Sequence, residues 1–172
     1  MSLPAAMDSQ HGVMIHYRDK GIFIFGEPGV GKSSLALELI HQGAELIADD
    51  VVDFTLENDQ LIAHCPKLLS GLLHTRELGL IDIRKVCGEA SWDASTIADL
   101  CIELKQVHHP QACVATPTDQ KVILGKPLVV LTLSVENPAS FKTRIDSWLT
   151  MQTIHKDSHE KMQLWQLDKM AF

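Results

Sequence analysis

The sequence lacks the long apolar runs, the positive charge and the opening segment that would point to membranes or nucleic acids. No apolar run among its 172 residues approaches the roughly 20 residues that cross a bilayer. Residues 1–6 have neither the basic start nor the apolar stretch of a signal peptide. A formal net charge of −7 argues against nucleic acid as the main partner. We therefore expect a cytoplasmic protein that binds neither nucleic acid nor membrane.

Cysteine is scarce and is not arranged for metal or disulfide chemistry. The four cysteines, Cys65, Cys87, Cys101 and Cys113, show no C-x-x-C spacing, so a zinc site and a disulfide framework are both poorly supported. Reduced, buried thiols are the expectation for a cytosolic protein. The hydrophobic content of 45% is ordinary for a globular chain, and the length predicts a single domain, 1–172, with a sizeable core.

The sequence does contain a phosphate-binding motif between a predicted strand and a predicted helix. The apolar run 21–25 is typical of a buried strand, and residues 33–42 have the apolar spacing of a helix that packs through one face. Gly43 stands where a helix usually ends. The pattern G-x-x-x-x-G-K-[ST] is matched by Gly26, Glu27, Pro28, Gly29, Val30, Gly31, Lys32 and Ser33.

The chemistry of this motif explains its residue types. Glycines let the backbone curl with no Cβ in the way of a ligand, so that amide N–H groups converge on a phosphate. The following helix presents its free N–H groups and the positive end of its dipole to the same anion. Lys32 is expected to reach the β and γ phosphates and Ser33 to ligate Mg²⁺. The alternative, a glycine-rich turn that binds nothing, is disfavoured by the Lys-Ser pair and the flanking elements.

Two adjacent carboxylates follow the next predicted strand. Residues 45–48 form a short apolar run that ends in Asp49 and Asp50. Nucleotide-binding folds place a Mg²⁺ ligand or a catalytic base at such a position. Adjacent side chains of an extended segment point in different directions, so that one aspartate can face the metal and the other an incoming hydroxyl. A solvated acidic turn is the alternative interpretation.

The remaining pattern predicts an α/β fold, a P-loop-containing mixed sheet flanked by helices. Residues 11–25 predict a hairpin that leads into the loop, and residues 53–64 predict a second hairpin. Residues 97–104 alternate between apolar and polar, which predicts a strand with one wet face and is typical of antiparallel pairing. Residues 128–133 predict a central strand.

The ends of the chain are predicted to be less regular. Residues 1–10 are mixed in character and are expected to be disordered. Asn137 and Pro138 predict an N-cap and first turn of a helix. Residues 153–172 are expected to form a C-terminal helical tail.

Taken together, the run from Gly21 to Asp50 resembles the HPr kinase/phosphorylase family, also called HPr(Ser) kinase. It carries the loop, the Ala-Leu-Glu-Leu of the following helix, the glycine after it and the Ala-Asp-Asp of the next strand. His11-Gly12-Val13 matches the family's His-Gly element, and residues 72–82 resemble its signature segment. The likeness is good from about residue 10 to residue 85 and thin after that. It implies a nucleotide-binding core similar to that of HPr kinase and PEP carboxykinase.

The resemblance also implies an activity and a role for each matching residue. The family uses ATP and Mg²⁺ to phosphorylate a serine of HPr, the small phosphocarrier protein of the bacterial sugar phosphotransferase system, and removes that phosphate by phosphorolysis. Asp50 would take the proton from the serine, with His11 beside it. Lys32 would hold the phosphates, and Arg76 falls on the arginine of the signature segment. Ser33 and Asp49 would hold the metal. A homo-oligomer, by family likeness a hexamer, is implied as well.

The sequence departs from the family at several points. No counterpart of the family's N-terminal domain is present, which is typical of a catalytic-domain-only short form. His74 stands where the family has a metal-binding glutamate, with Glu77 nearby, and Mg²⁺ prefers oxygen ligands. No arginine lies between Arg84 and Arg144, so the family's later basic residues lack a clear counterpart other than Lys126.

Two alternatives to an HPr kinase therefore stay open. One is a P-loop kinase with the same core and a different substrate. The other is a non-catalytic nucleotide-sensing module that signals through its partners. Transfer of phosphate from ATP to HPr separates the first interpretation from both.

Overall fold

The computed structural model describes residues 6–108 and 119–154. It divides the chain into two units, Met1–His108 with Thr118–Glu136, and His109–Pro117 with Asn137–Phe172. Within the described ranges, no helix is long and apolar enough to span a membrane. Cys113 and the predicted tail after residue 154 lie outside the described residues.

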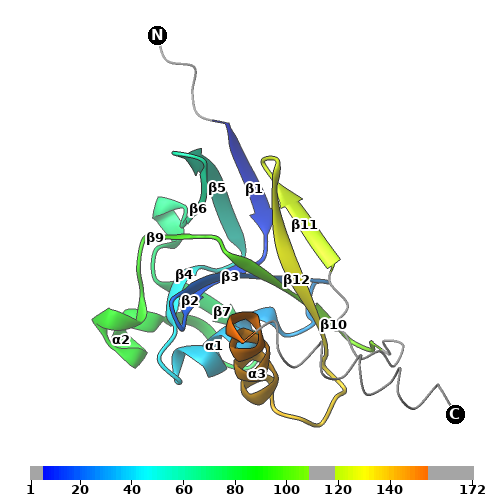
Figure 1. Ribbon diagram of the computed structural model, residues 1–172. Helices are drawn as coiled ribbons and strands as arrows, with labels where there is room; N and C mark the ends of the chain where they lie inside the picture. Colours follow the sequence, from blue (N-terminus) through cyan, green and yellow to red (C-terminus); the bar gives the residue numbers. More distant parts are fainter. Residues whose placement is uncertain (1–5, 109–118, 155–172) are drawn as a thin grey trace, which may run out of the picture. The chain divides into compact units, whose positions relative to one another are not determined.

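The first unit contains a six-stranded mixed sheet (Figure 1). Its order is β11-β12-β10-β3-β2-β4, with β3, β10 and β12 parallel and the other pairings antiparallel. The P-loop follows β3 and leads into helix α1, Lys32–Ile40. The strands are β2 (Val13–Tyr17), β3 (Lys20–Gly26), β4 (Glu45–Ala48), β10 (Leu100–Lys105), β11 (Asp119–Ile123) and β12 (Lys126–Ser134).

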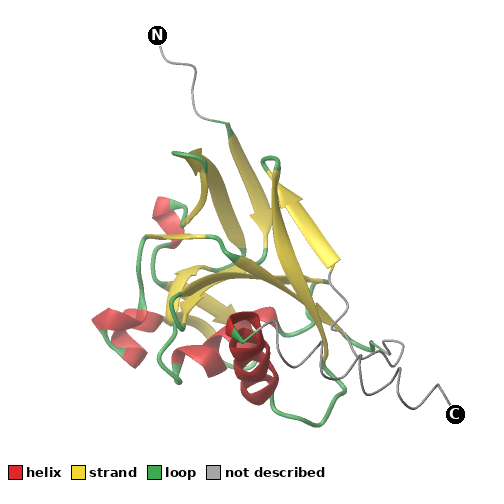
Figure 2. Cartoon of the chain, viewed as in Figure 1, coloured by secondary structure: helices red, strands yellow, loops and turns green. Residues whose placement is uncertain are grey.

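A second, four-stranded sheet is antiparallel throughout, in the order β1-β5-β6-β9. A separate hairpin, β7–β8, and several short helices complete this unit (Figure 2). The elements are β1 (Met7–His11), β5 (Val51–Glu57), β6 (Gln60–His64), β9 (Ser95–Ile97), β7 (Leu72–Thr75), β8 (Gly79–Asp82), α2 (Ile83–Cys87), η1 (Lys67–Leu69) and η2 (Glu89–Ser91).

The core of this unit joins the two larger sheets. Phe23 of β3 and Phe54 of β5 are both fully buried, and their rings meet edge to face with centroids 5.2 Å apart. The same cluster contains Met14 of β2, Ala63 of β6 and Cys101 of β10. Burial raises the pKa of the Cys101 thiol to about 12. The predicted burial is confirmed for this cysteine, whereas Cys65 and Cys87 are only partly buried.

The structure confirms the α/β class, the mixed sheet, the strand–loop–helix around the P-loop and the two predicted hairpins. The predicted antiparallel pairing of residues 97–104 is wrong, because β10 lies parallel to both β3 and β12. The alternation of apolar and polar residues in this strand has another cause. Glu103 is partly exposed and accepts a hydrogen bond from the Thr132 hydroxyl on β12, so this polar residue has a partner within the parallel part of the sheet.

Two predicted boundaries also differ from the structure. Residues 7–10 are not disordered, because they form most of β1, which pairs along its whole length with β5. In the second unit, helix α3 spans Phe141–Thr153, and its N-cap is Ser140 instead of Asn137. The Ser140 hydroxyl accepts a hydrogen bond from the Thr143 N–H, whereas Asn137 accepts one from Ala139 and forms a turn before the helix.

The contact between Phe23 and Phe54 gives a prediction about stability. Replacing Phe54 by Ala should lower the free energy of unfolding by about 3–5 kcal/mol, because it leaves a cavity where the two sheets meet. The matched control is Leu56→Ala, two residues further along β5 on a side chain that is 36% exposed, which should cost less than about 1 kcal/mol. Chemical denaturation measures both, and equal losses would contradict this account of the core.

Candidate active site

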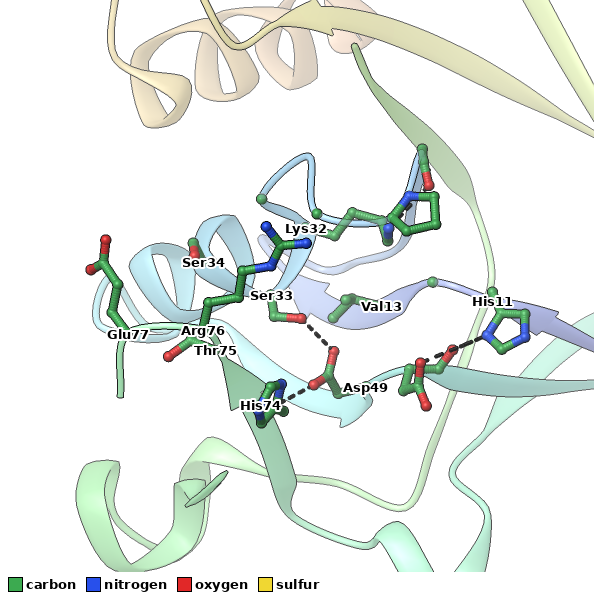
Figure 3. Close-up of a pocket in the computed structure, with 16 residues that line it drawn as sticks. His11, Val13, Lys32, Ser33, Ser34, Asp49, His74, Thr75, Arg76 and Glu77 are labelled. Carbon is green, nitrogen blue, oxygen red and sulfur yellow. Dashed lines mark hydrogen bonds and ion pairs between the residues drawn. The ribbon is translucent and has the colours of Figure 1, made fainter. Parts of the chain in front are cut away.

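A pocket of about 730 Å³ lies at the P-loop, and most residues singled out in the sequence line it. The lining comes from four places: the junction of β1 and β2, the P-loop with the first turn of α1, the two residues after β4, and the β7–β8 hairpin (Figure 3). It consists of His11, Gly12, Val13, Gly26, Pro28, Gly29, Gly31, Lys32, Ser33, Ser34, Asp49, Asp50, His74, Thr75, Arg76 and Glu77. Glu27 and Val30 belong to the loop but are not part of this lining.

The P-loop needs glycine where other chain segments approach it. Gly26 has a φ of 145°, and a Cβ there would run into the backbone carbonyl of Leu104 on β10. Gly29 has a φ of 81°, and a Cβ there would run into the guanidinium of Arg76. The loop is therefore packed closely between β10 and the β7–β8 hairpin, and only glycine allows both approaches.

Lys32 is held by the carbonyls of its own loop. Its Nζ donates hydrogen bonds to the Gly26 and Glu27 carbonyl oxygens, each at 3.0 Å. Glu27 thus contributes through its backbone. The lysine ammonium lies within the curl of the loop, where an anion bound by the surrounding N–H groups would meet a positive charge.

Asp49 connects three segments of the pocket. Its Oδ1 accepts a hydrogen bond from the Ser33 hydroxyl at 2.8 Å, and its Oδ2 accepts one from the His74 backbone N–H at 2.7 Å (Figure 3). The residue is 6% exposed. Burial raises the pKa of the Asp49 carboxyl above its ordinary value of 3.8, and these two hydrogen bonds oppose that rise. Burial therefore disfavours the ionised form of Asp49, while the two hydrogen bonds hold its carboxylate in place.

This pair of oxygens is suited to a hard divalent cation. A serine hydroxyl and an aspartate carboxylate are ligand types that Mg²⁺ accepts, and Mg²⁺ commonly keeps waters and phosphate oxygens as its other ligands. In the described part of the chain, no group of three or more His, Cys, Asp or Glu residues could hold a metal ion. Ser33 and Asp49 therefore fit the predicted metal site, with the other ligands to come from a nucleotide and water.

Asp50 points away from the buried Asp49 and pairs with His11. Its φ of 69° lies in the left-handed region, which Asp and Asn tolerate better than most residues. The His11 Nδ1 lies 3.2 Å from the Asp50 carbonyl oxygen and 3.7 Å from its carboxylate Oδ1. Both side chains are well exposed, 85% for His11 and 77% for Asp50. Both atoms facing Nδ1 are acceptors, so Nδ1 carries a proton in this arrangement.

The β7–β8 hairpin supplies residues that sequence reasoning assigned differently or missed. Arg76 extends from it toward the P-loop (Figure 3). His74 contributes its backbone N–H to Asp49, a role that no side-chain pattern could reveal.

Other lining residues lie outside this hairpin or have no predicted role of their own. Gly12, whose N–H donates to the Asp50 carbonyl at 3.1 Å, enters the sequence analysis only as part of the His-Gly element. Ser34 and Thr75 also line the pocket but are not among the predicted site residues, although Ser34 follows the P-loop motif and Thr75 lies within the signature-like segment 72–82.

The chain matches a family model and two groups of known proteins. The model described as HPr Serine kinase C-terminal domain matches residues 4–167. The HPr kinase/phosphorylase of Bordetella avium is 51% identical over 82 residues, which cover 47% of this chain and 27% of that protein. The HPr kinase/phosphorylase of Cupriavidus necator is 48% identical over 84 residues, 48% of this chain and 26% of that protein. The chain thus spans about a quarter of the length of the curated relatives it matches.

A solved structure shares the fold over almost the whole chain. The Hpr(Ser) kinase/phosphatase from Coxiella burnetii superposes with a TM-score of 0.78 over 95% of this chain and 97% of that one, at 24% sequence identity. At that identity, the likeness establishes the fold. Because the family model covers nearly all of the sequence, the chain belongs to the HPr Serine kinase C-terminal domain family.

Proposed function

We propose that this chain is the catalytic domain of an ATP- and Mg²⁺-dependent kinase that phosphorylates a serine of the phosphocarrier protein HPr. One observation carries the proposal. The P-loop lysine and the exposed His11–Asp50 pair line the same pocket, so a phosphoryl donor and a hydroxyl acceptor can meet there. Family membership and the names of the relatives support HPr as the acceptor.

The donor end of the pocket holds the triphosphate. The backbone N–H groups of the loop and the N-terminus of α1 surround the β and γ phosphates, and Lys32 and Arg76 contribute positive charge. Ser33 and Asp49 would hold Mg²⁺, which neutralises phosphate charge when bound. Phosphoryl transfer depends mainly on such positioning and charge stabilisation.

The acceptor end supplies the base. In the proposed reaction the serine Oγ forms a bond to the γ phosphorus of ATP while the bond from that phosphorus to the bridging oxygen breaks, and ADP leaves. Asp50 takes the proton of the serine hydroxyl, and its exposed carboxylate is accessible to an incoming protein. The His11 Nδ1–H donates toward Asp50 and fixes the orientation of this residue.

The same arrangement serves the reverse chemistry. In phosphorolysis, hydrogen phosphate attacks the phosphoserine phosphorus, the bond to the serine oxygen breaks, and pyrophosphate and serine are formed. The proton that the attacking phosphate loses passes through Asp50 to the serine oxygen. We include this activity in the proposal as the reverse use of one site.

A conservative change at Asp50 tests the proposal directly. Asp50→Asn should lower phosphate transfer from labelled ATP to HPr by roughly 10²–10⁴-fold, because an amide cannot accept the serine proton. Nucleotide affinity, measured by calorimetry in the presence of Mg²⁺, should change little, because Asn tolerates the left-handed backbone of this position.

The chain offers a matched control for this variant. Asp59 has a similar backbone, with a φ of 66°, and a side chain that is 89% exposed in the β5–β6 turn. Asp59→Asn should leave transfer unchanged. Transfer retained by Asp50→Asn would remove Asp50 as the base. For the wild type, ATP turnover without labelling of HPr would favour a different substrate. Nucleotide binding by the wild type without any transfer would favour a sensing module.

The buried position of Asp49 gives a pH dependence with a definite sign. The unfolded carboxyl ionises near 3.8, whereas burial holds the folded pKa above that value, so the folded state binds more protons between the two. The free energy of unfolding should therefore fall as pH rises through this window and then level off. Asp49→Asn removes the effect, because an amide can accept from the His74 N–H and donate to Ser33 without ionising.

Denaturation of the wild type and Asp49→Asn over a pH series measures this difference. The variant should gain stability relative to the wild type as pH rises from about 4, and the gain should become constant once Asp49 is fully ionised. A difference that is flat or shrinks with rising pH would contradict the burial of an ionised carboxylate here.

The contact between Gly29 and Arg76 gives a prediction about nucleotide binding. Gly29→Ala should weaken binding by roughly tenfold, equivalent to about 1.4 kcal/mol, because the new methyl group displaces the Arg76 guanidinium and the loop. Gly43→Ala is the control: Gly43 also has a positive φ, 95°, but a Cβ there meets no atom within 4 Å. Calorimetric titration with nucleotide should separate the two, and equal affinities would show that Arg76 does not constrain the loop.

A further inference from the structure

The four-stranded sheet has one face that the core does not use. In β5, the buried residues Val52 and Phe54 alternate with the partly exposed Asp53 and Thr55. The strand register aligns outward residues across the sheet, with Ser9 of β1 opposite Asp53 and Asp53 opposite His64 of β6. We call this the β1–β5–β6 face; its outward residues are Met7, Ser9, His11, Val51, Asp53, Thr55, Glu57, Gln60, Ile62 and His64.

This face begins at the proposed acceptor end of the active site. His11 is the last residue of β1 and is paired in register with Val51, the first residue of β5. Asp50 immediately precedes that pair. Figure 1 shows β1 and β5 running side by side. A protein whose serine reaches Asp50 therefore has this face as its adjacent surface.

Apart from two histidines, the ionisable side chains of the face are carboxylates. Strands β1, β5, β6 and β9 contain no lysine and no arginine. Asp53 accepts a hydrogen bond from Ser9, and Glu57, 58% exposed, lies 3.6 Å from His64. An exposed methionine, Met7 at 63%, lies beside them, and methionine is enriched in protein interfaces. Carboxylates next to an exposed apolar side chain match a basic partner surface that also has apolar contacts.

We propose that the β1–β5–β6 face is the docking surface for the phosphoryl-accepting protein, and that it recognises basic side chains around the acceptor serine. The inference rests on the proposed kinase function and adds where the acceptor lies and what charge it presents. Docking along the strands would deliver the serine hydroxyl to Asp50 and leave the P-loop side of the pocket open to nucleotide.

A charge reversal remote from the chemistry tests this surface. Glu57 lies seven residues after Asp50, about 20 Å along an extended strand, so Glu57→Lys leaves the catalytic pair intact. It should raise the KM for HPr by roughly tenfold at low ionic strength and leave the KM for ATP and kcat unchanged. The effect should shrink as salt is added, because exposed charges are screened. Glu57→Gln, which removes the charge but keeps the side-chain length, should give a smaller increase.

The matched control places the same charge change elsewhere. Glu38 is exposed on helix α1, outside the β1–β5–β6 face, and Glu38→Lys should leave both KM values unchanged. Equal KM values for HPr in the wild type, Glu57→Lys and Glu57→Gln would overturn the docking surface while the kinase function stood. A wild-type protein that transfers no phosphate to HPr would overturn both. Light scattering that shows a changed molecular mass for Glu57→Lys would assign the face to contacts between copies and overturn the proposal.

Discussion

The site depends on one buried carboxylate with two donors. Asp49 accepts from the Ser33 hydroxyl at the start of α1 and from the His74 N–H in β7, so it ties the phosphate-binding helix to the β7–β8 hairpin. Sheet order makes this possible. Strands β3 and β4 both pair antiparallel with β2, so they point the same way and their ends meet at one edge. The P-loop follows the C-terminal end of β3, and Asp49 follows the C-terminal end of β4 at the same edge of the sheet.

The step from Asp49 to Asp50 joins the two sheets. The chain leaves β4, turns through the left-handed conformation of Asp50 and enters β5 in the other sheet. The carbonyl of Asp50 accepts from the Gly12 N–H, which stabilises this turn against the β1–β2 connection. One residue therefore marks the junction of the sheets and presents an exposed carboxylate to the pocket. This explains how two neighbouring aspartates come to lie in such different environments.

Much of this could be predicted from the sequence, because the signals were local. The P-loop requires its own glycines, lysine and serine, and the strand and helix on either side have clear apolar periodicity. The aspartate pair followed from its position after the next strand.

What the sequence could not indicate are the interactions between distant segments. The parallel pairing of β10 depends on its neighbours β3 and β12, and Glu103 made it resemble a half-exposed antiparallel strand. The strand at residues 7–11 is short and polar, and it exists because β5 provides a partner. The His74 backbone donor has no side-chain signature, since every residue other than proline carries an N–H. The difference between His74 and the glutamate of the family concerns the side chain, so it does not bear on the backbone hydrogen bond from His74 to Asp49.

The two cations of the pocket, Lys32 and Arg76, and the exposed Asp50 belong to different parts of its lining, which would suit the proposed transfer between two bound partners. Lys32 and Arg76 lie at the P-loop side, where phosphate charge would gather. Asp50 belongs to a second part of the lining, beside His11, and the strands β1 and β5 that meet there contain no lysine or arginine. An anionic nucleotide is attracted to the first end and repelled by the second, whereas a basic protein surface has the opposite preference. Under the proposed function, each partner would therefore be directed to its own end of the pocket before the reaction.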